Sequence, residues 1–317
     1  MRRYRSIGDL PIGAGSRAVA IGAFDGVHLG HQEIIRLAVE AARHRSMRSM
    51  VITFDPNPLS VLRPELKTTE LTSAPFRARL IERLGVDELL EIPFTRALSH
   101  IRWDRFCEML SAPPIEAQSI AVGRNFRFGH GGVGTAKMLR DAGRARGIDV
   151  SIPGLVTSAD GKPISSTRVR RLLTHGDVDE ANSLLGRPHC LEGVVVHGDA
   201  RGTGLGIPTA NIDVLPRAAV PGRGVYACRV RVGDGVWSAA VNVGMAPTFR
   251  DTGPCRIEAF LIDFPERDLY GEHASLAFIG RLRGEQRFPS AELLVAQIHR
   301  DIVRARDIAT GVEDPLC

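Results

Sequence analysis

Apolar and polar positions in the first half of the chain alternate between the periods of strands and helices. Residues 17–24 (RAVAIGAF) form an apolar run typical of a buried strand, and residues 31–45 place Ile34, Ile35, Ala38, Val39 and Ala42 on one helical face. Further strands are expected at 49–56, 87–94, 115–123 and 148–154, and further helices at 76–85, 102–110, 135–147, 164–173 and 177–186. This alternation predicts an α/β doubly wound parallel sheet.

The pattern changes after Gly186-Arg187-Pro188, where short β-rich segments replace the helical periods. Strands are expected within 189–198, 225–244, 256–263 and 274–282, and Asp234-Gly235 is a two-residue hairpin signal. One amphipathic helix, 291–309, follows, with Leu294, Ile298 and Ile302 on a shared stripe. We therefore expect two domains, 1–186 and 187–317, the second a small β-barrel or sandwich with a C-terminal helix.

Composition indicates an ordinary globular protein, with 44% hydrophobic and 24% charged residues. No apolar run approaches the ~18 residues that cross a bilayer, and no apolar signal segment follows the basic start of the chain. We expect a cytoplasmic protein that does not enter a membrane. The five cysteines are scattered without a CxxC pair, which argues against a disulfide framework and a structural zinc site and favours reduced thiols.

The formal charge of +5 suits an anionic partner such as a phosphate compound or a nucleic acid. However, the basic run at 168–173 is also typical of one solvated helix face. Aromatic residues make up only 5%, few for a protein that stacks on bases. We therefore expect no nucleic-acid partner, and an oligonucleotide-binding protein is the weaker alternative.

Two histidines, His28 and His31, stand among Gly22, Gly26 and Gly30 where the first strand turns into the first helix. Such a turn, at the carboxyl edge of a parallel sheet, is where α/β folds bind ligands, and the helix N-terminus favours an anion. Zinc ligation is a minority alternative, because the surrounding sequence lacks further His or Cys ligands, and ordinary turn residues are another. Neither GxGxxG nor GxxxxGK[ST] occurs.

Several segments resemble one family. AIGAFDGVHLGHQ (20–32) and ISSTRVR (164–170) are similar to the two signatures of the nucleotidylyltransferase superfamily. Three segments between these signatures resemble the bacterial bifunctional riboflavin kinase and FAD synthetase branch, namely 53–58, 76–94 and 123–135. The second half of the chain resembles the kinase module of the same branch, in segments 192–212, 224–230, 242–249, 256–271 and 281–288. The resemblance covers nearly the whole chain in order, and it implies a nucleotidylyltransferase-like sheet followed by a β-barrel.

For the first domain, the resemblance implies that FMN attacks the α-phosphate of ATP, giving FAD and pyrophosphate. His28 and His31 would stabilise the triphosphate, and Asn125 would contact the substrates, including the flavin. The nucleotide would be held by Gly22, Phe24, Asp25, Gly30, Ser165, Ser166 and Thr167. Arg168 would supply a fixed charge for phosphate oxygens; the alternative for it is a helix-surface arginine.

For the second domain, the resemblance implies that riboflavin receives the γ-phosphate of ATP. The glycine-rich loop that would cover the phosphates contains Gly198, Arg201, Gly202, Gly204 and Gly206. Thr209 and Asn211 would hold Mg²⁺, and Glu258 would be the catalytic base, with a salt-bridged structural role as its alternative. Arg300 and Asp301 would border the flavin.

The implied substrates are therefore riboflavin, FMN and ATP, with Mg²⁺ as cofactor and transient self-association left open. The chain departs from the family pattern at three places. Ala23 stands where many relatives have a polar residue and Asn57 where many have a histidine, and the Met245-Ala246 pair is a variable version of its motif.

Overall fold

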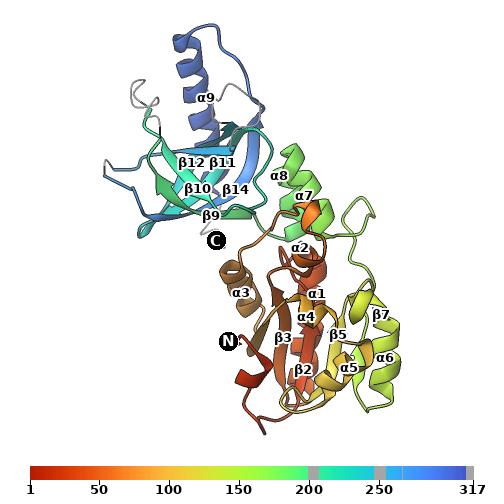
Figure 1. Cartoon of the computed structure of the whole chain (residues 1–317). Coiled ribbons are helices and arrows are strands. Elements are labelled where there is room, and N and C mark those ends of the chain that lie inside the picture. Colours follow the sequence, from red (N-terminus) through yellow and green to blue (C-terminus); the bar gives the residue numbers. More distant parts are fainter. Residues whose placement is uncertain (199–206, 246–254, 266, 312–317) are drawn as a thin grey trace. The chain divides into compact units, whose positions relative to one another are not determined.

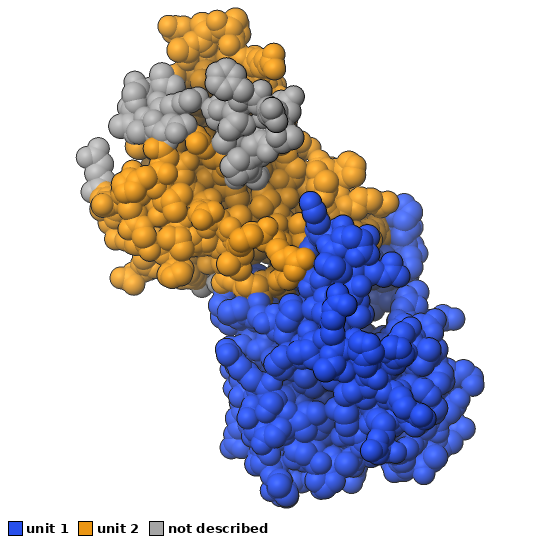
Figure 2. All heavy atoms as spheres, viewed as in Figure 1, with its two compact units in different colours: residues 1–68, 74–165 blue, residues 69–73, 166–317 orange. Residues whose placement is uncertain are grey.

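The computed structural model describes residues 1–198, 207–245, 255–265 and 267–311 (Figure 1). The chain forms two compact units, which Figure 2 distinguishes by colour. Unit 1 contains residues 1–68 and 74–165, and unit 2 contains residues 69–73 and 166–317. The helices between 166 and 185 thus group with unit 2, and the domain boundary expected at 186/187 stays a prediction.

Unit 1 is built on a six-stranded parallel sheet, which confirms the predicted parallel arrangement. Its order is β1 (Arg2–Tyr4), β4 (Glu88–Pro93), β3 (Arg48–Asp55), β2 (Arg17–Ile21), β5 (Ala117–Val122) and β8 (Asp149–Ser151). The chain runs outward from β2 through β3 to β4, then returns to the other side of β2 with β5. The strand order therefore reverses beside β2, the place where α/β sheets bind ligands. β1 is an edge strand that the sequence did not predict.

The helices of unit 1 are α1 (Leu29–His44), α2 (Pro58–Leu62), α3 (Ala74–Arg83), α4 (Arg96–Ser99), α5 (Trp103–Ser111) and α6 (Ala136–Arg144). Four of them, α1, α3, α5 and α6, are close to their expected positions, and the short α2 and α4 were not predicted. A two-stranded ribbon, β6 (Arg127–Phe128) and β7 (Gly134–Thr135), precedes α6. α1 buries Ile35, Ala38, Val39 and Ala42 of the face that its periodicity predicted, and Ile34 of that face is partly buried.

A buried ion pair lies at the amino ends of β2 and β4 in the sheet of unit 1. Arg17, at the start of β2, donates from Nε to Oε2 of Glu88, at the start of β4, at 2.6 Å. Both side chains are almost completely buried. Arg48 donates to the other oxygen of Glu88 at 3.1 Å. These charges are paired with one another at the end of the sheet opposite the carboxyl ends of the strands.

Unit 2 contains a closed antiparallel barrel, which confirms the barrel rather than a sandwich. Around the barrel the strands are β10 (Ala210–Val214), β13 (Cys255–Leu261), β12 (Gly235–Met245), β11 (Gly224–Val232), β14 (His273–Arg283) and β9 (His189–Val196). Its helices are α7 (Ser166–His175), α8 (Val178–Leu185) and α9 (Ala291–Thr310). Residues 69–73 join this unit because Glu70 pairs with the segment around Ala218.

Side chains alternate between two faces of the barrel wall. On β13, Ile257 and Ala259 are buried, while the neighbouring Glu258 faces the opposite side. α9 packs against β11, β12 and β14, and Ile302 from its predicted stripe contacts the cluster formed there. The barrel thus has an apolar interior and a second, more polar surface next to α9.

The cysteines follow the expectation in part. Cys107 and Cys228 are free and buried, whereas Cys190 is disulfide-bonded, which corrects the prediction of a reduced thiol at that position. Within the described ranges, no helix is long and apolar enough to span a membrane. Nor do three His, Cys, Asp or Glu side chains of these ranges gather into a metal-binding group.

Candidate active sites

The turn after β2 brings the predicted nucleotide-binding residues of the first signature together. Phe24, Gly26 and Val27 all have positive φ, so the backbone between β2 and α1 folds back sharply. Thr53 of β3 holds this turn, because its hydroxyl donates to the carbonyl of Ala23 at 3.1 Å. Asp25 is 3% exposed. The family departure at Ala23 therefore involves a residue whose backbone has a structural role.

His28 is the N-cap of α1. Its Nδ1 accepts a hydrogen bond from the backbone N–H of His31 at 3.2 Å, and the two rings stack with centroids 3.6 Å apart. Because Nδ1 is an acceptor, the neutral ring carries its proton on Nε2, which is then a donor. The pair combines imidazole donors with the N-terminal end of a 16-residue helix. This arrangement can bind and stabilise a phosphate chain.

Gly30 explains why the stacked histidines fit. A Cβ at this position would lie 3.2 Å from Cε1 of His28, tighter than ordinary contact, and 3.9 Å from the carbonyl oxygen of Ile164. The first residue of the second signature thus lies beside the glycine of the first. The structure brings these two sequence motifs together although more than a hundred residues separate them.

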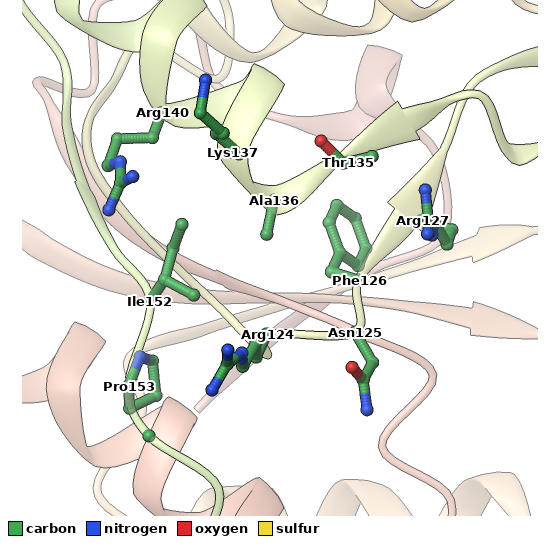
Figure 3. A pocket seen from close by; sticks show the side chains of 11 residues that line it. Arg124, Asn125, Phe126, Arg127, Thr135, Ala136, Lys137, Arg140, Ile152 and Pro153 are labelled. Carbon is green, nitrogen blue, oxygen red and sulfur yellow. The ribbon is translucent and has the colours of Figure 1, made fainter.

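Asn125 follows β5 and lines a pocket of about 730 Å³ (Figure 3). Arg124 comes from the same loop and Arg140 from α6, and both extend toward the side formed by Ile152 and Pro153. Phe126 adds an aromatic wall. The pocket can accept an anionic ligand with a flat apolar part. The sequence singled out only Asn125 of this pocket; Arg124, Phe126 and Arg127 are its neighbours in the chain, and the remaining lining residues come from two other segments, 135–140 and 152–154.

The remaining residues of the second signature lie at the unit boundary. Ser165 is the last residue of unit 1, and Ser166 and Thr167 begin α7 of unit 2. Arg168 is 9% exposed, and its Nη2 donates to Oε1 of Glu180 on α8 at 2.6 Å. The alternative of an exposed helix-surface arginine is therefore excluded. Its role toward phosphate stays a prediction.

Unit 2 has a cavity of about 820 Å³ between the barrel wall and α9. Glu258 and Thr209, both predicted from the sequence, line it. Glu258 lies 3.7 Å from Nη1 of Arg256 and 3.5 Å from Nδ2 of Asn242, with 30% of its side chain exposed. This carboxylate can accept a proton from a ligand in the cavity. Because the contact to Arg256 is long, a purely salt-bridged role is the weaker interpretation.

Asn211 stands opposite Glu258 in the register of β10 and β13. Its amide packs closely on Gly198, where a Cβ would lie only 2.0 Å from Nδ2 of Asn211. Thr209, two residues before Asn211, lines the cavity. Gly198 therefore has a physical reason to be glycine, which is to admit the Asn211 side chain. The other predicted residues of the phosphate-covering loop, Arg201, Gly202, Gly204 and Gly206, lie outside the described residues.

The two flavin-binding candidates on α9, Asp301 and Arg300, differ in burial and in whether they line the cavity. Asp301 is 2% exposed and lines the cavity, together with Leu294 and Ile298 of the predicted stripe. Arg300 is exposed and donates to Oε1 of Gln297 at 2.6 Å. The cavity also contains Asn242, Arg256 and Arg283, which the sequence analysis missed. Period-2 alternation along β13 is the signal that could have placed Arg256 on the same face as Glu258, whereas the position of Asn242 depends on the register of β12 with β13.

The departures from the family pattern have local consequences. Asn57 is the N-cap of α2, where its Oδ1 accepts from the N–H of Leu59 at 3.0 Å. Met245 ends β12, and Ala246 lies outside the described residues.

A parallel α/β unit with an imidazole-lined anion site, joined to a closed barrel with a carboxylate in its cavity, defines a two-module nucleotide-dependent transferase. The FAD synthetase family matches residues 13–168, and the riboflavin kinase family matches residues 185–309. Curated proteins called bifunctional riboflavin kinase/FMN adenylyltransferase are 36% identical in Listeria monocytogenes, over 94% of both chains, and 37% identical in Pseudomonas fluorescens, over 91% of this chain and 92% of that one. The chain therefore belongs to the family of bifunctional riboflavin kinase/FMN adenylyltransferases.

One solved structure resembles the whole chain. A crystal structure described as a macrolide-efflux protein from Streptococcus pneumoniae has a TM-score of 0.85 and 33% identity, and covers 96% of this chain and 98% of that one. This likeness shows that the fold of both units is shared. The activity in that description is said of that protein alone.

Proposed function

We propose that the chain makes FMN from riboflavin in unit 2 and FAD from FMN in unit 1, with ATP as the second substrate of both reactions. The observation that carries the proposal is that each unit has its own set of reactive groups: the stacked His28 and His31 in one, and Glu258 in a cavity in the other. The relatives that carry both activities in their name match along both units.

In unit 1, an oxygen of the FMN phosphate attacks the α-phosphorus of ATP, and the bond to the pyrophosphate leaving group breaks. No covalent enzyme intermediate is needed, so placement and charge stabilisation supply the rate. The Nε2–H of His28, fixed by the cap hydrogen bond at Nδ1, donates to phosphate oxygens. His31 and the N-terminal N–H groups of α1 add to this stabilisation. Asp25 and Asn125 contact the substrates, and Ser165, Ser166, Thr167 and Arg168 hold phosphate oxygens.

In unit 2, Glu258 takes the proton of a ribityl hydroxyl of riboflavin. The hydroxyl oxygen then forms a bond to the γ-phosphorus of ATP while the bond to ADP breaks. Asp301 and Arg300 border the flavin at α9. Asp301, whose oxygens accept from Arg283 and Gln297, is the better supported of the two because it lines the cavity.

Thr209 and Asn211 fit Mg²⁺ chemically, because this ion takes oxygen ligands and binds proteins through few side chains when substrate phosphates complete its shell. Their separation by two residues directs both to one face of an extended segment. Mg²⁺ bound there would neutralise phosphate charge. Two expectations stay predictions, a cytoplasmic location and no nucleic-acid partner, and transient self-association stays open.

A time course with riboflavin, ATP and Mg²⁺, resolved by chromatography into riboflavin, FMN and FAD, tests the proposal. His28→Asn keeps a side chain that can cap α1 but removes the imidazole, so we expect this variant to accumulate FMN without FAD. Glu258→Gln should make no FMN from riboflavin yet convert added FMN to FAD. The matched control for His28→Asn is His44→Asn, at the other end of α1. The matched control for Glu258→Gln is Glu272→Gln, which lies outside the cavity.

Each assignment can also be contradicted by a particular result of these assays. FAD synthesis by His28→Asn at the wild-type rate would overturn the first site, and FMN synthesis by Glu258→Gln would overturn the second. A wild-type chain that makes FMN but no FAD would show that one unit has lost its reaction. Salt-sensitive binding to an oligonucleotide, with neither reaction present, would favour the nucleic-acid alternative.

A further inference from the structure

Asn242 and Glu258 stand directly opposite each other on adjacent strands. The register pairs Asn242 of β12 with Glu258 of β13, and the distance from Nδ2 of Asn242 to Oε2 of Glu258 is 3.5 Å. Both side chains line the cavity of unit 2. Val241 and Val243, on either side of Asn242, are buried on the opposite face of the strand. The strand period therefore fixes the Asn242 side chain on the cavity face.

The surroundings of Glu258 differ at its two oxygens. Oε2 faces the neutral amide of Asn242, whereas Oε1 lies 3.7 Å from the guanidinium of Arg256. An amide donor can hold a carboxylate in one orientation without adding a positive charge. A positive charge at this place would lower the pKa of the carboxylate and so make it a weaker base. The distance of 3.5 Å is at the long end of hydrogen bonding, and such contacts tighten when a substrate binds.

Gly244 gives the Asn242 amide its space. A Cβ at position 244 would lie 3.3 Å from Nδ2 of Asn242 and 3.2 Å from Oε1 of Glu285, both closer than ordinary contact. The bare glycine thus leaves room for the amide beside Glu258.

We propose that Asn242 is a positioning residue for the phosphorylation of riboflavin, whose Nδ2–H donates to Oε2 of Glu258 and orients the carboxylate toward the substrate hydroxyl. The proposal rests on the proposed function of unit 2. During the reaction the hydroxyl proton moves to Glu258, the hydroxyl oxygen bonds to the γ-phosphorus, and the bond to ADP breaks. Asn242 keeps its protons and forms no covalent bond.

The test measures kcat and KM for riboflavin phosphorylation by Asn242→Ala and Asn242→Asp between pH 5.5 and 9. For Asn242→Ala we expect kcat to fall about 10- to 100-fold, with the KM for riboflavin and the KM for ATP each within about 3-fold of wild type. Asn242→Asp has nearly the same shape but puts a second carboxylate beside Glu258. Because like charges raise a carboxyl pKa, its acidic limb should move up by about one pH unit or more.

Two controls separate this role from a structural one. Conversion of FMN to FAD by the same variant chains should be unchanged, because neither Asn242 nor the cavity that it lines is proposed to take part in that reaction. Val236→Ala, on β12 outside the cavity, should leave both reactions unchanged. A variant that only loosened the barrel would lower the unfolding temperature without shifting the pH profile of the protein that remains folded.

The outcomes are distinguishable. If Glu258→Gln is inactive while Asn242→Ala keeps its kcat and Asn242→Asp keeps the wild-type pH profile, the positioning role is wrong and the proposed base stands. If Glu258→Gln still phosphorylates riboflavin, the assignment of the base fails and the role of Asn242 fails with it. If Asn242→Ala does not fold, the pH profile of Asn242→Asp decides alone.

Discussion

Arg283 on β14 donates from Nε to Oδ2 of Asp301 on α9 at 2.8 Å, and Asp301 is 2% exposed. Gln297 donates to the other carboxylate oxygen at 2.9 Å. A buried carboxylate is tolerated when its oxygens are paired in this way. The contact joins the last helix to the barrel at the wall of the cavity, so a residue predicted to border the flavin also holds the wall in place.

Removing this carboxylate should destabilise unit 2. Asp301→Ala leaves the guanidinium of Arg283, with 14% of its side chain exposed, without its partner, and we expect the free energy of unfolding to fall by about 3 kcal/mol. Urea unfolding of the full chain measures this change. Asp307→Ala, on the exposed side of the same helix, is the matched control. Equal stability of the two variants would mean that the pair contributes nothing.

Gly198→Ala should act on one reaction only. The new Cβ would fall 2.0 Å from Nδ2 of Asn211, so the amide must leave its position. We expect kcat/KM for riboflavin phosphorylation to fall by about 10-fold or more, because the proposed Mg²⁺ ligand is displaced, with FAD synthesis from FMN unchanged. Gly311→Ala is the control, because nothing lies within 4 Å of its added Cβ. Normal phosphorylation by Gly198→Ala would show that Asn211 need not stay where it is.

Burial lowers the pKa of His189 from 6.5 to about 4. Its Nε2 donates to the carbonyl of Ala219 at 2.8 Å, so the folded barrel holds the neutral ring. Below pH 6.5 the unfolded chain takes up a proton that the folded chain does not, and stability therefore falls as the pH is lowered. The loss should be about 3 kcal/mol between pH 7.5 and pH 4.

Urea unfolding at several pH values measures this dependence. His189→Gln keeps an N–H donor without a titrating group and should flatten the slope below pH 6.5. His273→Gln, at an exposed position, should not. An unchanged slope in His189→Gln would assign the acid sensitivity to other groups.

Glu88→Ala should destabilise unit 1 while leaving its site intact. The substitution leaves Arg17 buried without its carboxylate, which costs about 3 to 5 kcal/mol. Because Glu88 lies at the amino end of β4, the residues after the carboxyl end of β2 keep their positions. We expect a lower unfolding midpoint in urea and, at low temperature, a normal KM for ATP in FAD synthesis. Glu82→Ala, which removes an exposed ion pair to the N-terminus, should change stability little.

Some of the site could be predicted because its residues are neighbours in the sequence. His28 and His31 are three residues apart at a helix start, so local geometry alone places them together. Thr209 and Asn211 share one face of an extended segment for a similar reason. Asn242 and Glu258 are 16 residues apart on different strands, and their approach depends on the register of β12 with β13. The pocket at Asn125 likewise combines a loop, a helix and the segment at Ile152, which only folding brings together.

The sequence by itself determined the order of the longer strands and helices, the change from an α/β to a β-rich region, and the locally encoded turn at His28, because periodicity and turn chemistry act over a few residues. It did not predict the short elements β1, β10, α2 and α4. Only the tertiary structure decided that the barrel closes, that β1 completes the sheet, that Arg168 pairs with Glu180, and that Asn242 faces Glu258. These features depend on strand pairing and side-chain packing between distant segments, and a one-residue change of register would reverse which face each side chain occupies.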